Sequence, residues 1–135
     1  MVVHSLYNAP MKYLNHLNEE VQQDYYEHMR SVFLKRCQSL IDDHMKQYHW
    51  DEQLILHKGR RYDKIVVQSI GDATEPHNTR VYAFVDKTNG DILKPESWRK
   101  PAKHARGNIY EDDCMQFMTP YGPAYMDAIK DYYGA

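Results

Sequence analysis

A stretch of 48 residues without glycine or proline, residues 11–58, constrains the fold of this chain most strongly. Within it, apolar side chains recur every three or four residues from Leu14 to Tyr48, which is the spacing of one face of an α-helix. One continuous helix over these residues would be about 52 Å long at 1.5 Å per residue, longer than a small domain needs. We therefore expect the helical region to be interrupted.

Asn18 is the expected point of interruption. Its side chain can cap a helix that begins with Glu19 and Glu20, two acidic residues that are favourable in the first turn. The sequence thus predicts a short helix near residues 10–17 and a long helix over residues 19–49. If the long helix extends past the rest of the fold, its exposed side would form a homodimer surface.

After Trp50 the sequence changes to short runs rich in β-branched and aromatic residues, separated by turn-forming residues. Asn89 and Gly90 stand between two of these runs. Because both residue types tolerate a positive φ, they predict a type I′ hairpin turn. Short connections favour an antiparallel meander of four strands, expected over residues 54–57, 62–70, 80–86 and 91–94.

Two prolines, Pro95 and Pro101, argue against a long regular element in the next segment, so a loop is expected there. Asn108 and Glu111 then form a capping pattern for a short helix, and Pro123 precedes another. The predicted fold class is α+β: a long N-terminal helix packed on a four-stranded antiparallel meander, with two short C-terminal helices. Those two helices are expected over residues 110–118 and 124–133.

The 135 residues suit a single domain. We expect a helical part over residues 1–52, an antiparallel sheet over 53–94, and a basic loop with C-terminal helices over 95–135. No apolar run approaches the roughly 20 residues of a membrane span, and the first residues lack a leader pattern, so an intracellular protein without a membrane partner is expected. Cys37 and Cys114 are far apart and are predicted to be reduced and buried.

Charge is distributed unevenly along the chain, whose formal net charge is −2. Residues 1–57 carry five basic and eight acidic side chains, residues 58–110 carry 11 and six, and residues 111–135 carry one and five. A basic central region therefore stands between two acidic regions. Either the acids neutralise the basic region within the fold, or the basic region faces an anionic partner. The sequence leaves both explanations open.

The basic character is concentrated in "WRKPAKHARGNI", residues 98–109. Cations that can pair with phosphates and an aromatic ring that can stack on a base are the residue types of a nucleic-acid surface. Lys64 and Arg80 are expected to extend this surface. The exposure of Trp98 decides between a ligand-binding surface and a purely structural role for this segment. The candidate binding residues are Trp98, Arg99, Lys100, Lys103, His104, Arg106, Arg60 and Arg61.

Signals for catalysis are weak. HExxH, CxxC and glycine-rich phosphate loops are absent, so we expect no catalytic residues, metal or cofactor, and a non-enzymatic function is favoured. The acidic run Glu111, Asp112 and Asp113 has two explanations: a Mg²⁺ site, as in a small nuclease, or the first turn of a helix, which also favours acids.

The segment 80–113, "RVYAFVDKTNGDILKPESWRKPAKHARGNIYED", resembles a group of small uncharacterised proteins of tailed bacteriophages and large DNA viruses. These carry an FVDKxNGD hairpin, a KPxSW step and a PAKxxRGNI tail in this order, and Glu96 stands here where alanine is usual. The resemblance implies a viral accessory or virion protein, in the cytoplasm of an infected host cell or in the virion. It brings no catalytic residues.

Three hypotheses follow. The first is a virus-encoded accessory protein that binds nucleic acid through the basic residues. The second is a virion or host-protein-interaction component whose long helix, residues 19–49, forms a homodimer. The third is a small metal-dependent nuclease.

Overall fold

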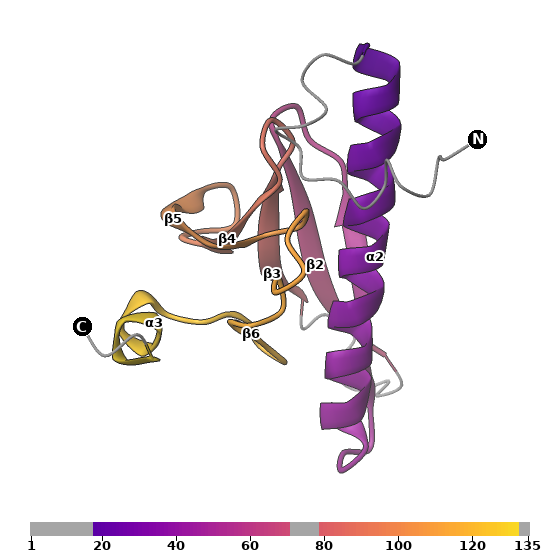
Figure 1. Ribbon diagram of the computed structural model, residues 1–135. Coiled ribbons are helices and arrows are strands. Elements are labelled where there is room, and N and C mark those ends of the chain that lie inside the picture. The colour runs from indigo at the N-terminus through magenta and orange to yellow at the C-terminus, as the bar shows by residue number, and fades with distance from the viewer. Residues whose placement is uncertain (1–17, 71–78, 133–135) are drawn as a thin grey trace.

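A computed structural model describes residues 18–70 and 79–132 of the chain (Figure 1). The predicted short helix near residues 10–17 lies outside the described residues. The fold is α+β, as predicted. Its elements in chain order are α2 (Glu19–Met45), β1 (Asp51–His57), β2 (Tyr62–Ile70), β3 (Thr79–Asp86), β4 (Asp91–Pro95), β5 (Pro101–Asn108), β6 (Met118–Thr119), β7 (Gly122–Pro123) and α3 (Met126–Tyr132).

Helix α2 begins where the capping pattern predicted. The Asn18 side chain accepts a hydrogen bond from the Val21 amide at 2.9 Å, and α2 ends at Met45, four residues before the predicted end. Its buried residues recur every three or four positions and pack on the sheet. No helix within the described residues is long and apolar enough to cross a membrane. The buried side chains of α2 are Tyr25, Tyr26, Arg30, Phe33, Cys37, Ile41 and Met45.

The main sheet has five antiparallel strands in the order β1-β2-β3-β4-β5, not the predicted four. The additional strand, β5, occupies the segment predicted to be a loop. Pro95 ends β4, Pro101 begins β5, and the two prolines face each other across the hairpin. Because β5 is an edge strand and both prolines stand at strand ends, neither removes a central ladder hydrogen bond. The meander therefore continues through the basic segment.

The connection between β3 and β4 forms a turn at the predicted place. Gly90 has a φ of 82°, and its amide donates to the Asp86 carbonyl at 2.7 Å. No described residue other than glycine has a positive φ, so Asn89 does not adopt the conformation that a type I′ turn requires. The predicted turn type is wrong, although the hairpin is confirmed.

The predicted helix over residues 110–118 is not formed. Asn108 is the last residue of β5, and its side-chain amide donates to Asn89 O and to Asp91 Oδ1, so it ties β5 to β4. Tyr110 is buried and stacks on Tyr25 with ring centroids 5.0 Å apart. The following residues make turns closed by bonds three residues apart, such as Cys114 N to Glu111 O. Of the two predicted C-terminal helices, only α3 is present.

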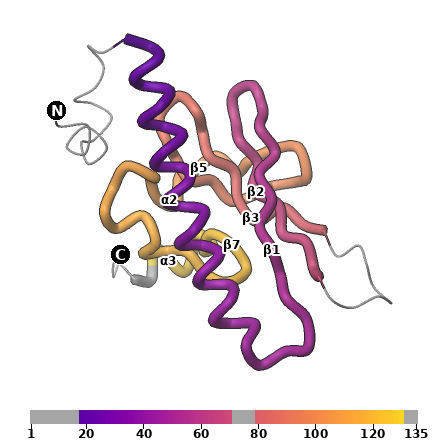
Figure 2. The backbone as a smooth tube through the Cα atoms, turned by 90° about the vertical axis from the view of Figure 1, so that its right-hand side faces the viewer, coloured from indigo at the N-terminus to yellow at the C-terminus, as the bar shows by residue number. Residues whose placement is uncertain are grey.

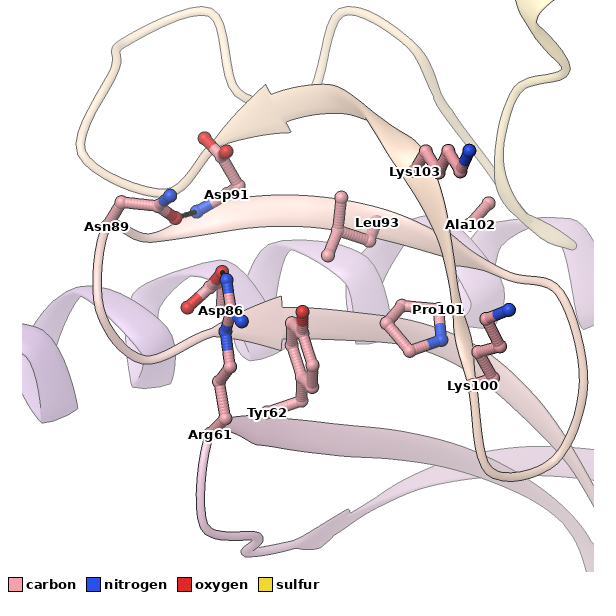
Figure 3. Close-up of a pocket in the computed structure, with 10 residues that line it drawn as sticks. All are labelled: Arg61, Tyr62, Asp86, Asn89, Asp91, Leu93, Lys100, Pro101, Ala102 and Lys103. Carbon is pink, nitrogen blue, oxygen red and sulfur yellow. Dashed lines mark hydrogen bonds and ion pairs between the residues drawn. The ribbon is translucent and has the colours of Figure 1, made fainter.

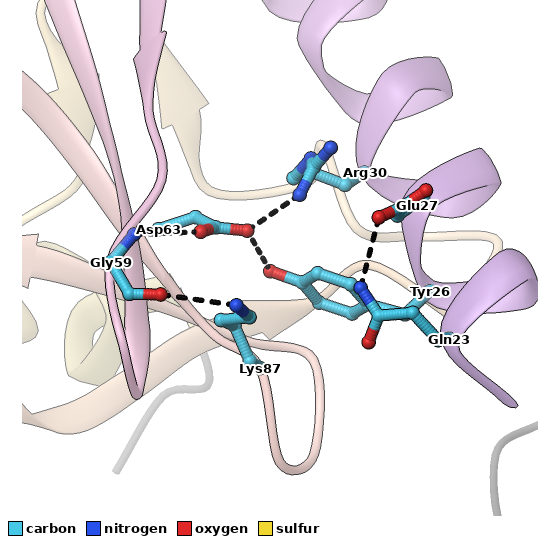
Figure 4. A network of polar contacts seen from close by, with 7 residues as sticks. All are labelled: Gln23, Tyr26, Glu27, Arg30, Gly59, Asp63 and Lys87. Atoms are coloured by element: carbon cyan, nitrogen blue, oxygen red, sulfur yellow. Dashed lines mark hydrogen bonds and ion pairs between the residues drawn. The ribbon is translucent and has the colours of Figure 1, made fainter. Parts of the chain in front are cut away.

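A buried polar network joins α2 to β2 (Figure 4). Asp63 is completely buried, and its Oδ2 accepts hydrogen bonds from Arg30 Nη1 at 2.7 Å and from the Tyr26 hydroxyl at 2.8 Å. Its Oδ1 accepts from the Gly59 amide at 3.2 Å. Burial and the hydrogen bond to Asp63 raise the pKa of Tyr26. The network fixes the end of the β1–β2 hairpin against the helix.

Candidate functional site

Helix α2 covers one face of the main sheet and runs along one side of it in Figure 1, and Figure 2 shows the same arrangement after a 90° turn. Asp63 points toward α2, where it binds Arg30. Because successive side chains of a strand alternate, Tyr62 and Lys64 point to the opposite face. Phe84 of β3 pairs with Lys64 and shares that face. We call it the open face.

The hairpin between β4 and β5 brings Trp98 onto the open face. The Lys64 ammonium lies 4.4 Å from the centroid of the Trp98 ring and 5.9 Å from that of the Phe84 ring. Trp98 nevertheless remains 44% exposed. The ammonium is attracted electrostatically by the face of the indole ring, and this attraction holds Lys64 beside Trp98. The exposure of Trp98 favours a ligand-binding surface over a purely structural role for this segment.

A pocket of about 530 Å³ lies on this face between β2, the β3–β4 turn and the β4–β5 hairpin (Figure 3). Apolar side chains line it from three strands: Tyr62, Leu93, Pro101 and Ala102. In the close-up, α2 runs behind the sheet, so the pocket opens on the side away from the helix.

Charged and polar side chains also line this pocket. Arg61, Lys100 and Lys103 supply three cations. Asp86, Asn89 and Asp91 gather at the end near the β3–β4 turn, where Asp86 Oδ2 lies 3.4 Å from Arg61 Nη2. The pocket therefore combines an apolar surface, a cationic border and a cluster of hydrogen-bonding groups.

Most of the predicted binding residues are exposed. Lys100 pairs with Glu96 at 3.3 Å, and both side chains are largely exposed, so the pair is weak and can exchange. His104 is exposed but does not line the pocket. Arg60 and Arg99 are exposed and adjoin the pocket residues Arg61 and Lys100 in sequence. We use the term basic face for Arg60, Arg61, Lys64, Trp98, Arg99, Lys100 and Lys103.

Arg106 and Arg80 lie apart from the basic face. Arg106 is buried, and its guanidinium donates to the carbonyls of Ala124 at 3.1 Å and His104 at 2.5 Å. Burial lowers the pKa of Arg106. Arg80 pairs with Glu52 of β1 at 3.0 Å. Arg106 therefore holds the segment before α3 in place, and Arg80 joins strands that are not neighbours.

Within residues 18–70 and 79–132, the ion pair of Glu52 with Arg80 links an acidic region to the basic central region, and none links an acidic region to residues 98–106. Among the described residues, the ion pair of Lys100 with Glu96 is the one that involves residues 98–106, and Glu96 belongs to the same hairpin. Arg99 and Lys103 form no ion pair within this part of the chain. Direct neutralisation by the acids of α2 or of residues 111–113 is not observed.

The described residues give little for catalysis. No group of three His, Cys, Asp or Glu side chains in residues 18–70 and 79–132 is arranged to hold a metal ion. Glu111, Asp112 and Asp113 are exposed in a series of turns. Cys37 and Cys114 are free and buried, as predicted, and burial raises the pKa of the Cys37 thiol to about 12. Such thiols are poor nucleophiles.

Sequence reasoning missed the pocket and the position of Tyr62 in it. The position of Tyr62 could have been found from the alternation of side chains in β2. Asp63 and Ile65 are buried, so Tyr62 and Lys64 between and beside them must point to the other face of the sheet. Once β5 is recognised as a strand, the same alternation can be followed across the hairpin. The pocket itself depends on side chains from three strands and could not be read from any one of them.

Residues 5–121 of the chain match a family of unknown function, DUF7717. No curated protein and no solved structure matches the chain. The family match covers the helix, the whole five-stranded sheet and the pocket, so the geometry of these elements carries the functional argument.

Proposed function

The chain belongs to the DUF7717 family of unknown function, and from this premise we propose that it is a non-enzymatic protein that binds nucleic acid through its basic face. The observation that carries the proposal is the contact of Lys64 with Trp98, 4.4 Å from ammonium to ring centroid. Because Lys64 belongs to the β1–β2 hairpin and Trp98 to the β4–β5 hairpin, the contact shows that the cations of both hairpins lie near one exposed aromatic ring and the pocket.

The residue types on the basic face suit the two contributions to the affinity for a single strand, which are phosphate pairing and base stacking. Lysine and arginine pair with phosphates and release counterions, which makes affinity depend on salt. Aromatic side chains add stacking worth about 1–3 kcal/mol per base. Trp98 supplies an exposed ring, and Arg99 and Lys103 supply cations without an ion-pair partner among the described residues.

We further propose that the protein acts as a viral accessory protein in the infected host cell. This part rests on the resemblance of residues 80–113 to the phage and large-virus proteins, and that segment contains most of the basic face. Small viral proteins commonly act on nucleic acids or host proteins, which is an argument by association.

A second candidate function is protein interaction, which one further observation favours. Four aromatic rings meet at the C-terminal end of α2, with neighbouring centroids 5.2–5.6 Å apart. Three of them are more than a third exposed, and such clusters are common at protein contacts. Among the described residues of α2, Val32 is the one large apolar side chain that is exposed, which is too little for a dimer surface along the helix. The predicted homodimer through residues 19–49 would therefore use the aromatic cluster at the C-terminal end of α2. The four rings are His44, Tyr48, Trp50 and Tyr121.

Fluorescence anisotropy with labelled single-stranded DNA, RNA and duplex DNA over a salt series tests the first proposal. Replacing both Arg99 and Lys103 by alanine should weaken binding and, for a single strand, lower the magnitude of the salt slope by about 1.4, which is about 0.7 for each lost phosphate contact. The matched control replaces Lys35 and Lys130, two exposed lysines outside the basic face, and should leave the slope unchanged. Equal effects of the two double variants would contradict the proposal. Light scattering that shows a dimer, with no nucleic-acid binding at low salt, would favour protein interaction.

A further inference from the structure

We propose that the pocket on the open face accommodates one unpaired nucleotide, with its base against the apolar wall and its phosphate at the cationic border. The inference rests on the proposed function and narrows it to single strands, with a preference among bases. It also assigns a role to Tyr62, Asp91 and Ala102, which the basic character of the chain does not indicate.

Size is the first argument. The volume of about 530 Å³ falls within the range of roughly 300–1,000 Å³ that is typical of small-molecule sites. An isolated phosphate would leave most of this space unfilled, whereas a base with its sugar would fill a larger share of it. The pocket is therefore too large for backbone contacts alone.

The apolar wall suits the flat face of a base. Tyr62 is half-buried, and its ring is held edge-on against Phe84 with centroids 6.2 Å apart. The Arg61 guanidinium lies 5.1 Å from the Tyr62 ring centroid. Leu93 and Pro101 complete the apolar lining. A ring fixed in this way can receive a base with little loss of side-chain freedom.

The polar end of the pocket gives the preference among bases. Asn89 Oδ1 accepts from the Asp91 amide at 2.8 Å, and Asp91 Oδ1 accepts from Asn108 Nδ2 at 3.0 Å. The first bond holds the Asp91 backbone in the turn, and the second holds the Asp91 carboxylate through Oδ1. Its Oδ2 accepts no hydrogen bond within the described part of the chain. A carboxylate oxygen accepts from the exocyclic amino groups of cytosine and adenine, which thymine and uracil lack. We therefore infer that the pocket favours bases with an amino group.

The cations at the border complete the site. Lys100 and Lys103 stand on the β5 side and Arg61 on the β2 side, so a phosphate on either side of the bound base meets a positive charge. Lys100 is held only by its exposed pair with Glu96. A base in a duplex reaches such a pocket only after it leaves the stack, which costs a few kcal/mol per base in general. Single strands should therefore bind more tightly than duplexes.

Anisotropy titrations with oligo-dC, oligo-dT and an abasic oligonucleotide of equal length test the inference. For the wild type we expect oligo-dC to bind about tenfold more tightly than the other two, as one good base contact implies. Ala102→Phe fills the pocket and leaves every cation in place, so it should abolish the preference and keep the salt slope. Ala128→Phe, at an exposed position of α3, is the control for added bulk.

Asp91→Asn gives an independent test, because its new amide group donates where the carboxylate accepted. It should reverse the preference toward oligo-dT, whose O4 accepts a hydrogen bond. Salt-dependent binding that is equal for all three oligonucleotides would overturn the pocket inference and leave the proposed function standing. No binding at low salt would overturn both. Circular dichroism confirms that each variant is folded, and a misfolded Ala102→Phe leaves the Asp91→Asn reversal to decide.

Discussion

Replacing Asp63 by alanine should destabilise the protein more than any change on its surface. Asp63 is fully buried, and its Oδ2 is the acceptor for both Arg30 and Tyr26. The change leaves the Arg30 guanidinium, whose side chain is 9% exposed, without its counter-charge. It also leaves the Tyr26 hydroxyl without its acceptor.

The structure sets the magnitude. Removing one partner of a buried ion pair costs about 3–5 kcal/mol, because an uncompensated charge stays in the interior. Total stabilities of single domains are about 5–15 kcal/mol, so the variant should lose a large part of its free energy of unfolding. Glu96→Ala breaks the exposed pair with Lys100 and should cost at most about 1 kcal/mol. The two variants contrast a buried pair with an exposed pair in one protein.

Urea unfolding followed by far-ultraviolet circular dichroism measures both free energies. A double variant, Asp63→Ala with Arg30→Met, removes the unpaired charge and should recover part of the loss. The reasoning is refuted if Asp63→Ala costs less than about 1 kcal/mol, the value for an exposed pair. It is also refuted if the double variant is no more stable than Asp63→Ala alone.

Two further predictions concern stability. Burial raises the pKa of the Cys37 thiol from 9.0 to about 12, and burial with the charge of Glu111 raises the pKa of Tyr25 to about 12. The folded chain then keeps protons that the unfolded chain releases above about pH 9. The contribution of these two groups to the free energy of unfolding should therefore be nearly equal at pH 7 and pH 8 and smaller at pH 11. Urea titrations at these three pH values check this, and a free energy at pH 11 equal to that at pH 8 would contradict it. Gly122→Ala should lower the melting temperature, because Gly122 has a φ of 121° and a Cβ there would stand 2.5 Å from the Tyr82 carbonyl oxygen; an unchanged melting curve would contradict the stated strain.

The sequence predicted correctly the elements that depend on interactions between residues close together in the chain. The cap at Asn18 and the helical spacing that follows it need only neighbouring residues, and α2 begins as expected. The predicted end was wrong, because residues 46–49 have the composition of a helix but form turns that lead into β1. The strand pattern around β2 and β3 was likewise sufficient to place an antiparallel sheet.

The errors arose where tertiary pairing decided the outcome. Pro95 and Pro101 indicate a loop when considered alone, but at the ends of two paired strands they are compatible with a hairpin. Asn108 has the residue type of a helix cap, yet its side chain bonds to β4, and the chain turns toward the core at Tyr110. Composition could not distinguish a pairing asparagine from a capping one.

The same limit applies to the candidate site. Arg106 and Arg99 have the same residue type and lie in one basic segment, but Arg106 is buried against carbonyls and Arg99 is exposed. Arg99 lies in the connection between β4 and β5 and Arg106 lies within β5, so their exposure depends on where this turn falls and on the register of β5. The contact of Lys64 with Trp98 joins residues from different hairpins, so no sequence window contains it.

The separation of charge has a consequence that can be measured. The basic face carries six cations, and the acids of α2 and of residues 111–113 form no ion pair with residues 98–106 among the described residues. Under the proposed function, six contacts would be the upper limit for this face, which corresponds to a salt slope of about −4 for a single strand. A steeper slope would require cations outside the basic face. A slope near −1 would mean that the pocket supplies most of the affinity, since base contacts release few counterions.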